Sequence, residues 1–160
     1  MNGLRIDLYE KVWMLASGVL LAVFLVAVAA SVFQGFSLPG DEPRLDPTRT
    51  MVDPPFAQPA VVERAPGRYD AYVRVQIWAF VPNEIKVPAG SSVTFYLTSP
   101  DVQHGFMIER TNVNVMVLPG QVSKISARFD KPGEYLFVCH EYCGIGHHLM
   151  SGKVIVTPKS

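Results

Sequence analysis

Two patterns of hydrophobic residues divide the chain. The first is a continuous apolar run over residues 12–33, interrupted only by Ser17, Gly18 and Ser31. As a helix that rises 1.5 Å per residue, this run would be about 33 Å long, which matches the hydrocarbon core of a bilayer. Trp13 stands at its N-terminal edge, where an indole suits the membrane interface. The pattern predicts one transmembrane helix.

A cleaved signal peptide is the alternative for this segment, because Ala27-Val-Ala29 has the spacing of a cleavage site. The apolar run is longer than the roughly 7–15 residues of a signal core, and the residues before it carry no net charge. We therefore expect a retained anchor, preceded by a short tail at residues 1–11. Lys and Arg are balanced on the two sides of the helix, so charge does not decide its orientation.

The second pattern is alternation of apolar and polar residues from residue 69 onward. It is clearest at residues 71–77, 93–98 and 124–129. A period of two is typical of strands with one buried face. Turn signals with Pro, Gly or Asn separate the runs, and residues 152–156 form a last strand. Short strands at this spacing predict an all-β sandwich over residues 69–160.

Residues 34–68 connect the two patterned regions. Seven of the 13 prolines of the chain lie between Ser37 and Pro66. Since proline fixes φ and removes a hydrogen-bond donor, the composition predicts an extended, semi-rigid linker rather than a folded segment. We expect this linker to lie along a larger partner protein.

Charge and length set broad limits on function. The 160 residues include 14 Lys or Arg and 14 Asp or Glu, so the formal net charge is zero. A chain with no basic surplus and no nucleic-acid motif is not expected to bind nucleic acid. The length suffices for one modest domain and an appendage.

The only two cysteines of the chain mark the candidate site. Cys139 and Cys143 are followed by His147 and Met150 within twelve residues, and His104 lies upstream. Soft sulfur ligands mixed with imidazole favour copper over magnesium or calcium, and a single blue copper ion needs one Cys, two His and a weak Met. The additional thiolate allows both sulfurs to bridge two ions. The residues predict a two-copper, two-thiolate electron-transfer centre.

Other interpretations of these residues remain open. Positions 139, 143, 147 and 150 also fit one face of a helix, although Gly144 and Gly146 argue against a stable one. Two cysteines in an extracytoplasmic domain often form a structural disulfide. Zinc would accept Cys and His, but it has little use for Met150.

The cysteine segment resembles subunit II of the haem-copper oxidases, whose copper A motif reads Cys-x-Glu/Gln-x-Cys-Gly-x-x-His-x-x-Met with an upstream His. Residues 139–150 match this motif, and Ser99-Pro-Asp-Val-Gln-His104-Gly-Phe looks like the upstream segment. The resemblance covers residues 69–156. Among these subunits the chain looks most like the B-family, cytochrome ba-type enzymes, which have one membrane helix. The resemblance implies a cupredoxin-like Greek-key sandwich.

The resemblance also implies a ligand set. Cys139 and Cys143 would bridge two copper ions, and His104 and His147 would each cap one of them. Met150 and the backbone carbonyl of Glu141 would be weak ligands, one to each copper. A magnesium ion at the Glu141 carboxylate is a lesser alternative, because other relatives have Gln at this position.

Three further residues carry a role only through the resemblance. Trp78 and Phe80, on a predicted strand near the site, are core residues by default, but in the family an aromatic residue near the copper passes the electron in. Glu10 lies at the inner membrane edge, where B-family subunits have a Glu at the mouth of a proton path. An acidic residue at a helix start, favoured there by the helix dipole, is the alternative for Glu10.

We therefore expect a subunit of a terminal oxidase in the plasma membrane of a prokaryote, with a cytoplasmic N-terminus and the copper domain outside. It would accept electrons from cytochrome c and pass them to haem in a catalytic subunit I that reduces oxygen to water and pumps protons. One alternative is a stand-alone membrane-anchored copper carrier. Another is a copper-delivery protein, whose usual thioredoxin-like fold does not fit the β-only pattern.

Overall fold

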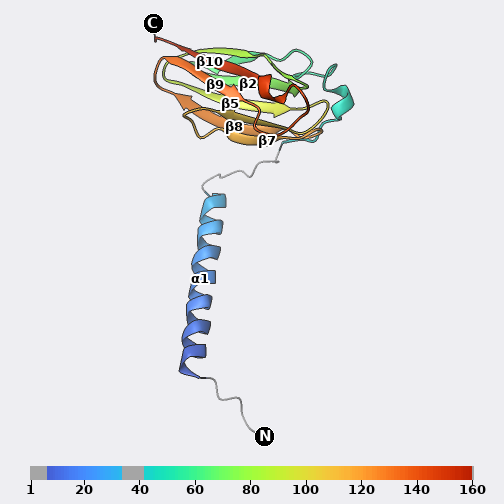
Figure 1. Ribbon diagram of the computed structural model, residues 1–160. Helices are drawn as coiled ribbons and strands as arrows, with labels where there is room; N and C mark the ends of the chain where they lie inside the picture. The colour runs from blue at the N-terminus through green and yellow to red at the C-terminus, as the bar shows by residue number, and fades with distance from the viewer. Residues whose placement is uncertain (1–6, 34–41, 160) are drawn as a thin grey trace. The chain divides into compact units, whose positions relative to one another are not determined.

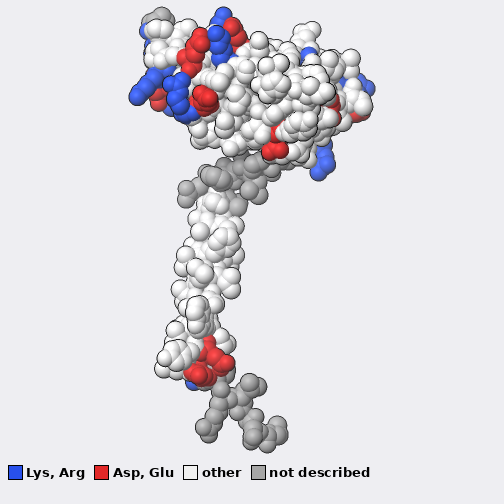
Figure 2. Space-filling model, viewed as in Figure 1, with Lys and Arg blue, Asp and Glu red and all other residues white. Residues whose placement is uncertain are grey.

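The computed structural model describes residues 7–33 and 42–159, and the chain divides into two units, Met1–Leu38 and Pro39–Ser160. The first unit contains helix α1 (Leu8–Phe33), which is long and apolar enough over Leu8–Ser31 to cross a membrane. Charged side chains occur only at its start, and the rest of its described surface is uncharged (Figure 2). The helix begins at Leu8, before the predicted residue 12, because the charged Glu10 and Lys11 interrupt the apolar run but not the helix. Most of the predicted tail, residues 1–6, lies outside the described residues.

The second unit is a sandwich of two sheets (Figure 1). One sheet has the strand order β1-β2-β5-β8, with β3 paired to β2, and the other has the order β4-β10-β9-β6-β7. The elements are β1 (Val61–Ala65), β2 (Arg68–Gln76), β3 (Ala79–Val81), β4 (Glu84–Pro88), β5 (Ser91–Thr98), β6 (His104–Ile108), β7 (Asn114–Val117), β8 (Ser123–Phe129), β9 (Gly133–Val138) and β10 (Ser151–Thr157), with short 3-10 helices η1 (Pro47–Arg49) and η2 (His147–Leu149).

The connections make this sandwich cupredoxin-like. Two neighbouring pairs, β2 with β5 and β4 with β10, are parallel, while the other pairs are antiparallel. Parallel neighbours cannot be joined by a hairpin. The chain therefore crosses repeatedly from one sheet to the other, and consecutive strands such as β4 and β5 belong to different sheets. The predicted all-β fold is confirmed.

The predicted alternation locates the core. Ala71, Val73 and Val75 of β2 are fully buried, and so are the apolar residues of β5. The pattern fails at Ile77, which is 42% exposed, because β2 ends at Gln76 and the chain turns there.

Aromatic rings fill the centre of the sandwich. Phe106 and Phe137 belong to β6 and β9, the two strands that lead to His104 and Cys139. Their ring centroids lie 5.1 Å apart, in the range of favourable aromatic pairs. Because both side chains are fully buried, this packing fixes the backbone on which these two candidate ligands stand. Phe80 and Phe95 pack against these two rings, and Phe129 continues the cluster through its contact with Phe95.

The described part of the predicted linker, residues 42–68, packs against the sandwich instead of lying free of it. Strand β1 falls within this region, and Phe56 is only 3% exposed, with its ring edge against Tyr72 at 5.9 Å. The largely buried Arg74 donates hydrogen bonds to the Phe56 carbonyl at 2.7 Å and to Gln76 Oε1 at 2.9 Å. Proline content predicts an extended backbone but does not say what that backbone contacts. The folded unit therefore begins well before residue 69.

We predict that Phe56→Ala lowers the free energy of unfolding of the full chain in detergent by roughly 3 kcal/mol, because it removes a buried ring and leaves a cavity. Met51→Ala, at a half-exposed position of the same segment, should change it by less than about 0.5 kcal/mol. Denaturant unfolding followed by tryptophan fluorescence measures both. Equal effects of the two substitutions would contradict the packing described for Phe56.

Candidate metal centre

The candidate ligands come from adjoining strand ends of one sheet. His104 is the first residue of β6, and Cys139 directly follows β9. Cys143, His147 and Met150 lie between β9 and β10, in a segment whose only regular structure is the single turn η2. A hydrogen bond of 3.2 Å from the Cys139 N–H to the Met150 carbonyl closes this segment into a loop. The alternative of a continuous helix over residues 139–150 is therefore wrong.

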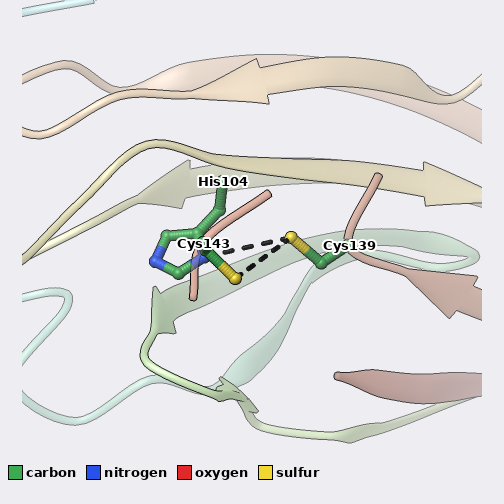
Figure 3. Close-up of side chains that lie close together, drawn as sticks. All are labelled: His104, Cys139 and Cys143. Atoms are coloured by element: carbon green, nitrogen blue, oxygen red, sulfur yellow. Dashed lines mark hydrogen bonds between the residues drawn. The ribbon is translucent and has the colours of Figure 1, made fainter. Parts of the chain in front are cut away.

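The two thiols lie side by side, and each has its own imidazole. The Sγ atoms of Cys139 and Cys143 are 3.8 Å apart. Nδ1 of His104 is 3.9 Å from Cys139 Sγ, and Nδ1 of His147 is 3.6 Å from Cys143 Sγ. His104 and the two cysteines are buried, and their ligand atoms all lie within 4.8 Å of one another (Figure 3).

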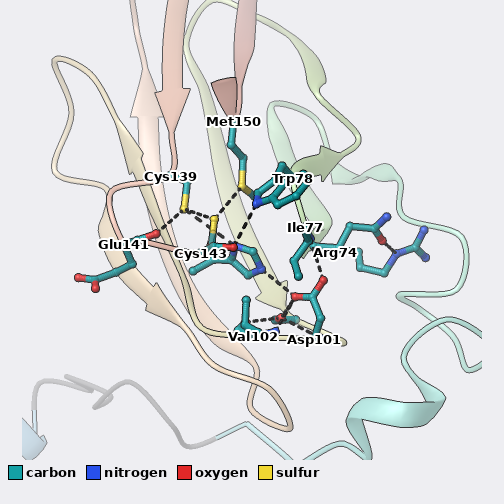
Figure 4. A network of polar contacts seen from close by, with 12 residues as sticks. Arg74, Ile77, Trp78, Asp101, Val102, Cys139, Glu141, Cys143 and Met150 are labelled. Carbon is teal, nitrogen blue, oxygen red and sulfur yellow. Dashed lines mark hydrogen bonds and ion pairs between the residues drawn. The ribbon is translucent and has the colours of Figure 1, made fainter. Parts of the chain in front are cut away.

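Two weaker donors complete the group (Figure 4). Met150 Sδ lies 3.8 Å from Cys143 Sγ, and the Glu141 carbonyl oxygen lies 3.2 Å from Cys139 Sγ. Met150 is only 2% exposed, so its thioether faces the thiols and not solvent. The structure thus brings together all six donors that the resemblance implied.

The spacing fits shared metal ligands. Donors bonded to one ion at the lengths of a zinc site, about 2.0–2.3 Å, lie about 3.3–3.8 Å apart at tetrahedral angles. A disulfide would need the sulfurs at about 2.05 Å, and both cysteines are free. A structural zinc site closes with four nitrogen or sulfur ligands. Six converging donors, one of them a thioether, exceed what one tetrahedral ion uses.

Burial and the neighbouring Cys139 sulfur raise the pKa of the Cys143 thiol to about 11. The thiolate is the metal ligand, so an incoming cation must displace this proton. Metal binding at this site is therefore linked to proton release.

Comparison with known proteins places the chain in a family. Residues 71–157 match the family described as cytochrome c oxidase subunit II, periplasmic domain. A cytochrome c oxidase subunit 2 of Thermus thermophilus is 43% identical over 153 residues, which cover 92% of this chain and 91% of that protein. The chain belongs to the cytochrome c oxidase subunit II family.

Solved structures agree with this assignment. A chain in a cryo-EM structure of a heme-copper terminal oxidase dimer matches this subunit II with a TM-score of 0.70 and 37% identity, over 94% of this chain and 99% of that one. The periplasmic domain of subunit II of the Bradyrhizobium japonicum cytochrome oxidase matches with a TM-score of 0.53 and 20% identity, over 56% of this chain and 84% of that one. The second likeness shows the fold.

In this subunit II, Asp101 orients the first histidine. Its Oδ1 lies 2.8 Å from His104 Nε2 and accepts a hydrogen bond from the N–H there, which leaves Nδ1 free to face the thiols. Partial burial raises the pKa of Asp101, but hydrogen bonds from His104, Ile77 and Val102 outweigh it and hold the pKa below its ordinary value. In the sequence, Asp101 appears only as part of the segment that precedes His104. Its spacing of three residues from His104 is the signal that could have found it.

The structure separates the two aromatic candidates. Phe80 is 2% exposed and belongs to the aromatic core. Trp78 is 44% exposed and lies in the turn between β2 and β3, not on a strand, where its indole N–H donates to the Cys143 carbonyl at 3.1 Å. Of these two residues, only Trp78 combines contact with the metal loop and access to solvent.

Close packing beside His104 explains why residue 105 is glycine. A Cβ on Gly105 would lie 2.6 Å from the His140 ring, so only glycine fits beside His104. His140 is thereby packed against the site but is not one of the converging donors. The Glu141 carboxylate points away from the thiols and accepts a hydrogen bond from Gln103 at 3.2 Å (Figure 4).

Glu10 lies in the other unit, in the first turn of α1. Its carboxylate accepts a hydrogen bond from the Asp7 N–H at 3.1 Å. This contact is the expected one for an acidic residue at a helix start.

We predict that Asp101→Ala lowers the affinity of the subunit for its metal by about 10- to 100-fold, because the His104 ring loses the group that orients it. Competition with a chelator of known affinity measures the loss. Asp130→Ala is the control, since that carboxylate pairs with Arg128 on the exposed surface. Unchanged affinity in the Asp101 variant would contradict the orienting role.

Proposed function

We propose that this subunit II holds two copper ions and is the electron-accepting subunit of a B-family, cytochrome ba-type terminal oxidase. One observation carries the proposal: two free thiols lie 3.8 Å apart, and each has an imidazole nitrogen within 4 Å. A single blue copper site would use one thiolate. The duplicated thiol and imidazole pairs, with one additional weak donor beside each thiol, fit two ions.

The residues divide the binding between them. Cys139 and Cys143 would bridge both ions, and His104 and His147 would cap one each. Met150 and the Glu141 carbonyl would be the weak ligands that tune the potential, as axial ligands do in blue copper sites. When bound, such a pair takes up and releases one electron that both metals share. Magnesium is not part of this proposal.

The domain would make this electron exchange fast by keeping the ligands in place. His104 is fully buried and each cysteine is 7% exposed, so little water would reorient when the charge changes. The ligand segments are attached to rigid strands of one sheet. Rigid placement of this kind holds a metal site close to one geometry.

The family and the apolar helix α1 support a proposal for the membrane arrangement and the partners of this subunit. We propose residues 1–11 as a cytoplasmic tail, residues 12–33 of α1 as a single membrane span, and the sandwich outside the plasma membrane of a prokaryote. Cytochrome c would donate electrons, and a haem-containing subunit I would receive them and reduce oxygen. A stand-alone copper carrier is the second candidate, and purification from native membranes distinguishes the two, since only a subunit brings a haem protein with it.

Of the two aromatic residues raised for electron transfer into the site, we propose Trp78. Its half-exposed indole contacts the backbone of Cys143. Phe80 is enclosed by other rings and offers no surface to a donor.

We predict that Cys143→Ser abolishes the shared-electron centre. The wild-type subunit should bind two coppers and show a seven-line copper hyperfine pattern in its EPR spectrum, because one unpaired electron couples equally to two nuclei. The variant should lose that pattern. His148→Ala, at an exposed histidine of the same loop, should keep it. A seven-line pattern that persists without Cys143 would refute the two-thiolate assignment.

For Glu10 we propose a role in proton uptake, by resemblance to B-family subunits. Glu10→Gln should slow steady-state oxygen reduction by the assembled oxidase while the rate of copper reduction stays unchanged. Lys11→Gln, which alters charge in the same helical turn without removing a carboxyl group, should affect neither rate. Unchanged turnover in the Glu10 variant would leave helix capping as the role of this residue.

A further inference from the structure

The two-residue turn Ile77–Trp78, between β2 and β3, contacts both segments that carry the candidate ligands (Figure 4). One of these segments contains Asp101 and His104. The other contains Cys143, His147 and Met150. The turn itself comes from the sheet that contains no ligand, because β2 and β3 belong to the opposite layer of the sandwich.

Trp78 holds the cysteine loop by a hydrogen bond and by packing. Its indole N–H donates to the Cys143 carbonyl at 3.1 Å. The ring also lies against two glycines of the loop. A Cβ on Gly146 would stand 2.5 Å from Trp78 Cδ2, and a Cβ on Gly144 would stand 3.2 Å from Nε1. The indole therefore occupies the space that side chains at these two positions would fill.

Ile77 holds the histidine segment. Its backbone N–H donates to Asp101 Oδ2 at 2.7 Å, and the other carboxylate oxygen accepts from His104 Nε2 at 2.8 Å. The carboxylate thus joins the turn to a ligand through two short hydrogen bonds. Hydrogen bonds to an ionised group are stronger than bonds between neutral groups.

We propose that this turn is a clamp that fixes the distance between the two ligand segments, and that Trp78 is its positioning residue. The copper-dependent part of this inference rests on the two-copper function proposed above, but the clamp itself does not. Without the indole, the hydrogen bond to Cys143 and the packing against Gly144 and Gly146 would be lost. The loop would then open more often, with β5 and the aromatic core unchanged.

The first test measures the loop without metal. In the copper-free, reduced full chain in detergent, hydrogen exchange would be followed at the His147, Leu149 and Met150 amides, which are hydrogen-bonded within the loop. Trp78→Phe keeps a ring but removes the N–H, and should speed exchange about fivefold, the effect of losing one ordinary hydrogen bond. Trp78→Leu removes the flat ring as well and should speed it further.

The control for this test lies in the same loop. Ile145→Ala changes an 84% exposed side chain between the two glycines and should leave exchange at the three amides unchanged. Amides of β5 report whether the fold is intact in every variant. Loop exchange that is the same in both Trp78 variants as in the wild type would overturn the clamp.

A double-mutant cycle tests the contact itself. Gly146 has φ −87°, which alanine adopts without strain, so the cost of Gly146→Ala comes from the approach to the indole. Gly146→Ala should speed loop exchange in the wild-type background and have little effect in the Trp78→Leu background. Non-additivity of this kind is the signature of a direct contact. An equal effect in both backgrounds would refute the packing role of Trp78.

The copper-loaded chain gives an independent readout. Trp78→Phe should still bind two coppers, release them to a chelator about fivefold faster, and show an altered copper hyperfine splitting. Wild-type release and splitting in this variant would overturn the link from the clamp to the metal. If the wild type bound a single ion, the two-copper proposal would fail. The hydrogen-exchange experiment, which is done without metal, would still test the clamp.

Discussion

The placement of two thiols 3.8 Å apart, under a nearly closed surface, is the constraint on which the rest of this protein depends. As thiolates at that distance, the sulfurs would repel by about 4 kcal/mol at an effective dielectric of 20. Burial and, after it, the neighbouring Cys139 sulfur raise the pKa of Cys143, so its proton stays on when no cation is present. A cation that binds both sulfurs removes the repulsion. The site is therefore organised for metal and is poorly suited to free thiolates.

The sandwich meets this constraint by dividing the work between its two sheets. One sheet supplies the ligands, because β6, β9 and β10 are neighbours and their ends meet. The other sheet supplies the Ile77–Trp78 turn, which contacts both ligand segments through Asp101 and Cys143. Phe106 and Phe137 sit between the layers and connect the ligand strands to the common core. Both layers therefore constrain the position of the ligands.

Periodicity and spacing could predict much of this arrangement. Alternation in β2 and β5 gave the buried faces, and the spacing of Cys139, Cys143, His147 and Met150 indicated the donors. The contacts of Ile77 with Asp101 and of Trp78 with Gly146 could not be predicted, because they join residues from different loops. A sequence shows that a glycine permits close approach, but it does not show what approaches. Likewise, the proline content of residues 34–68 described the backbone but not the buried contact of Phe56.

Strand β2 connects these observations. At its C-terminal end, Arg74 holds the Phe56 and Ala57 carbonyls and Gln76, and it has no carboxylate partner among the described residues. A buried cation satisfied by carbonyl oxygens is stable only while those carbonyls stay in place. The strand then enters the turn at Ile77. The segment before the sandwich and the metal loop are therefore held by the same strand end, and disorder in the first would loosen the support of the second.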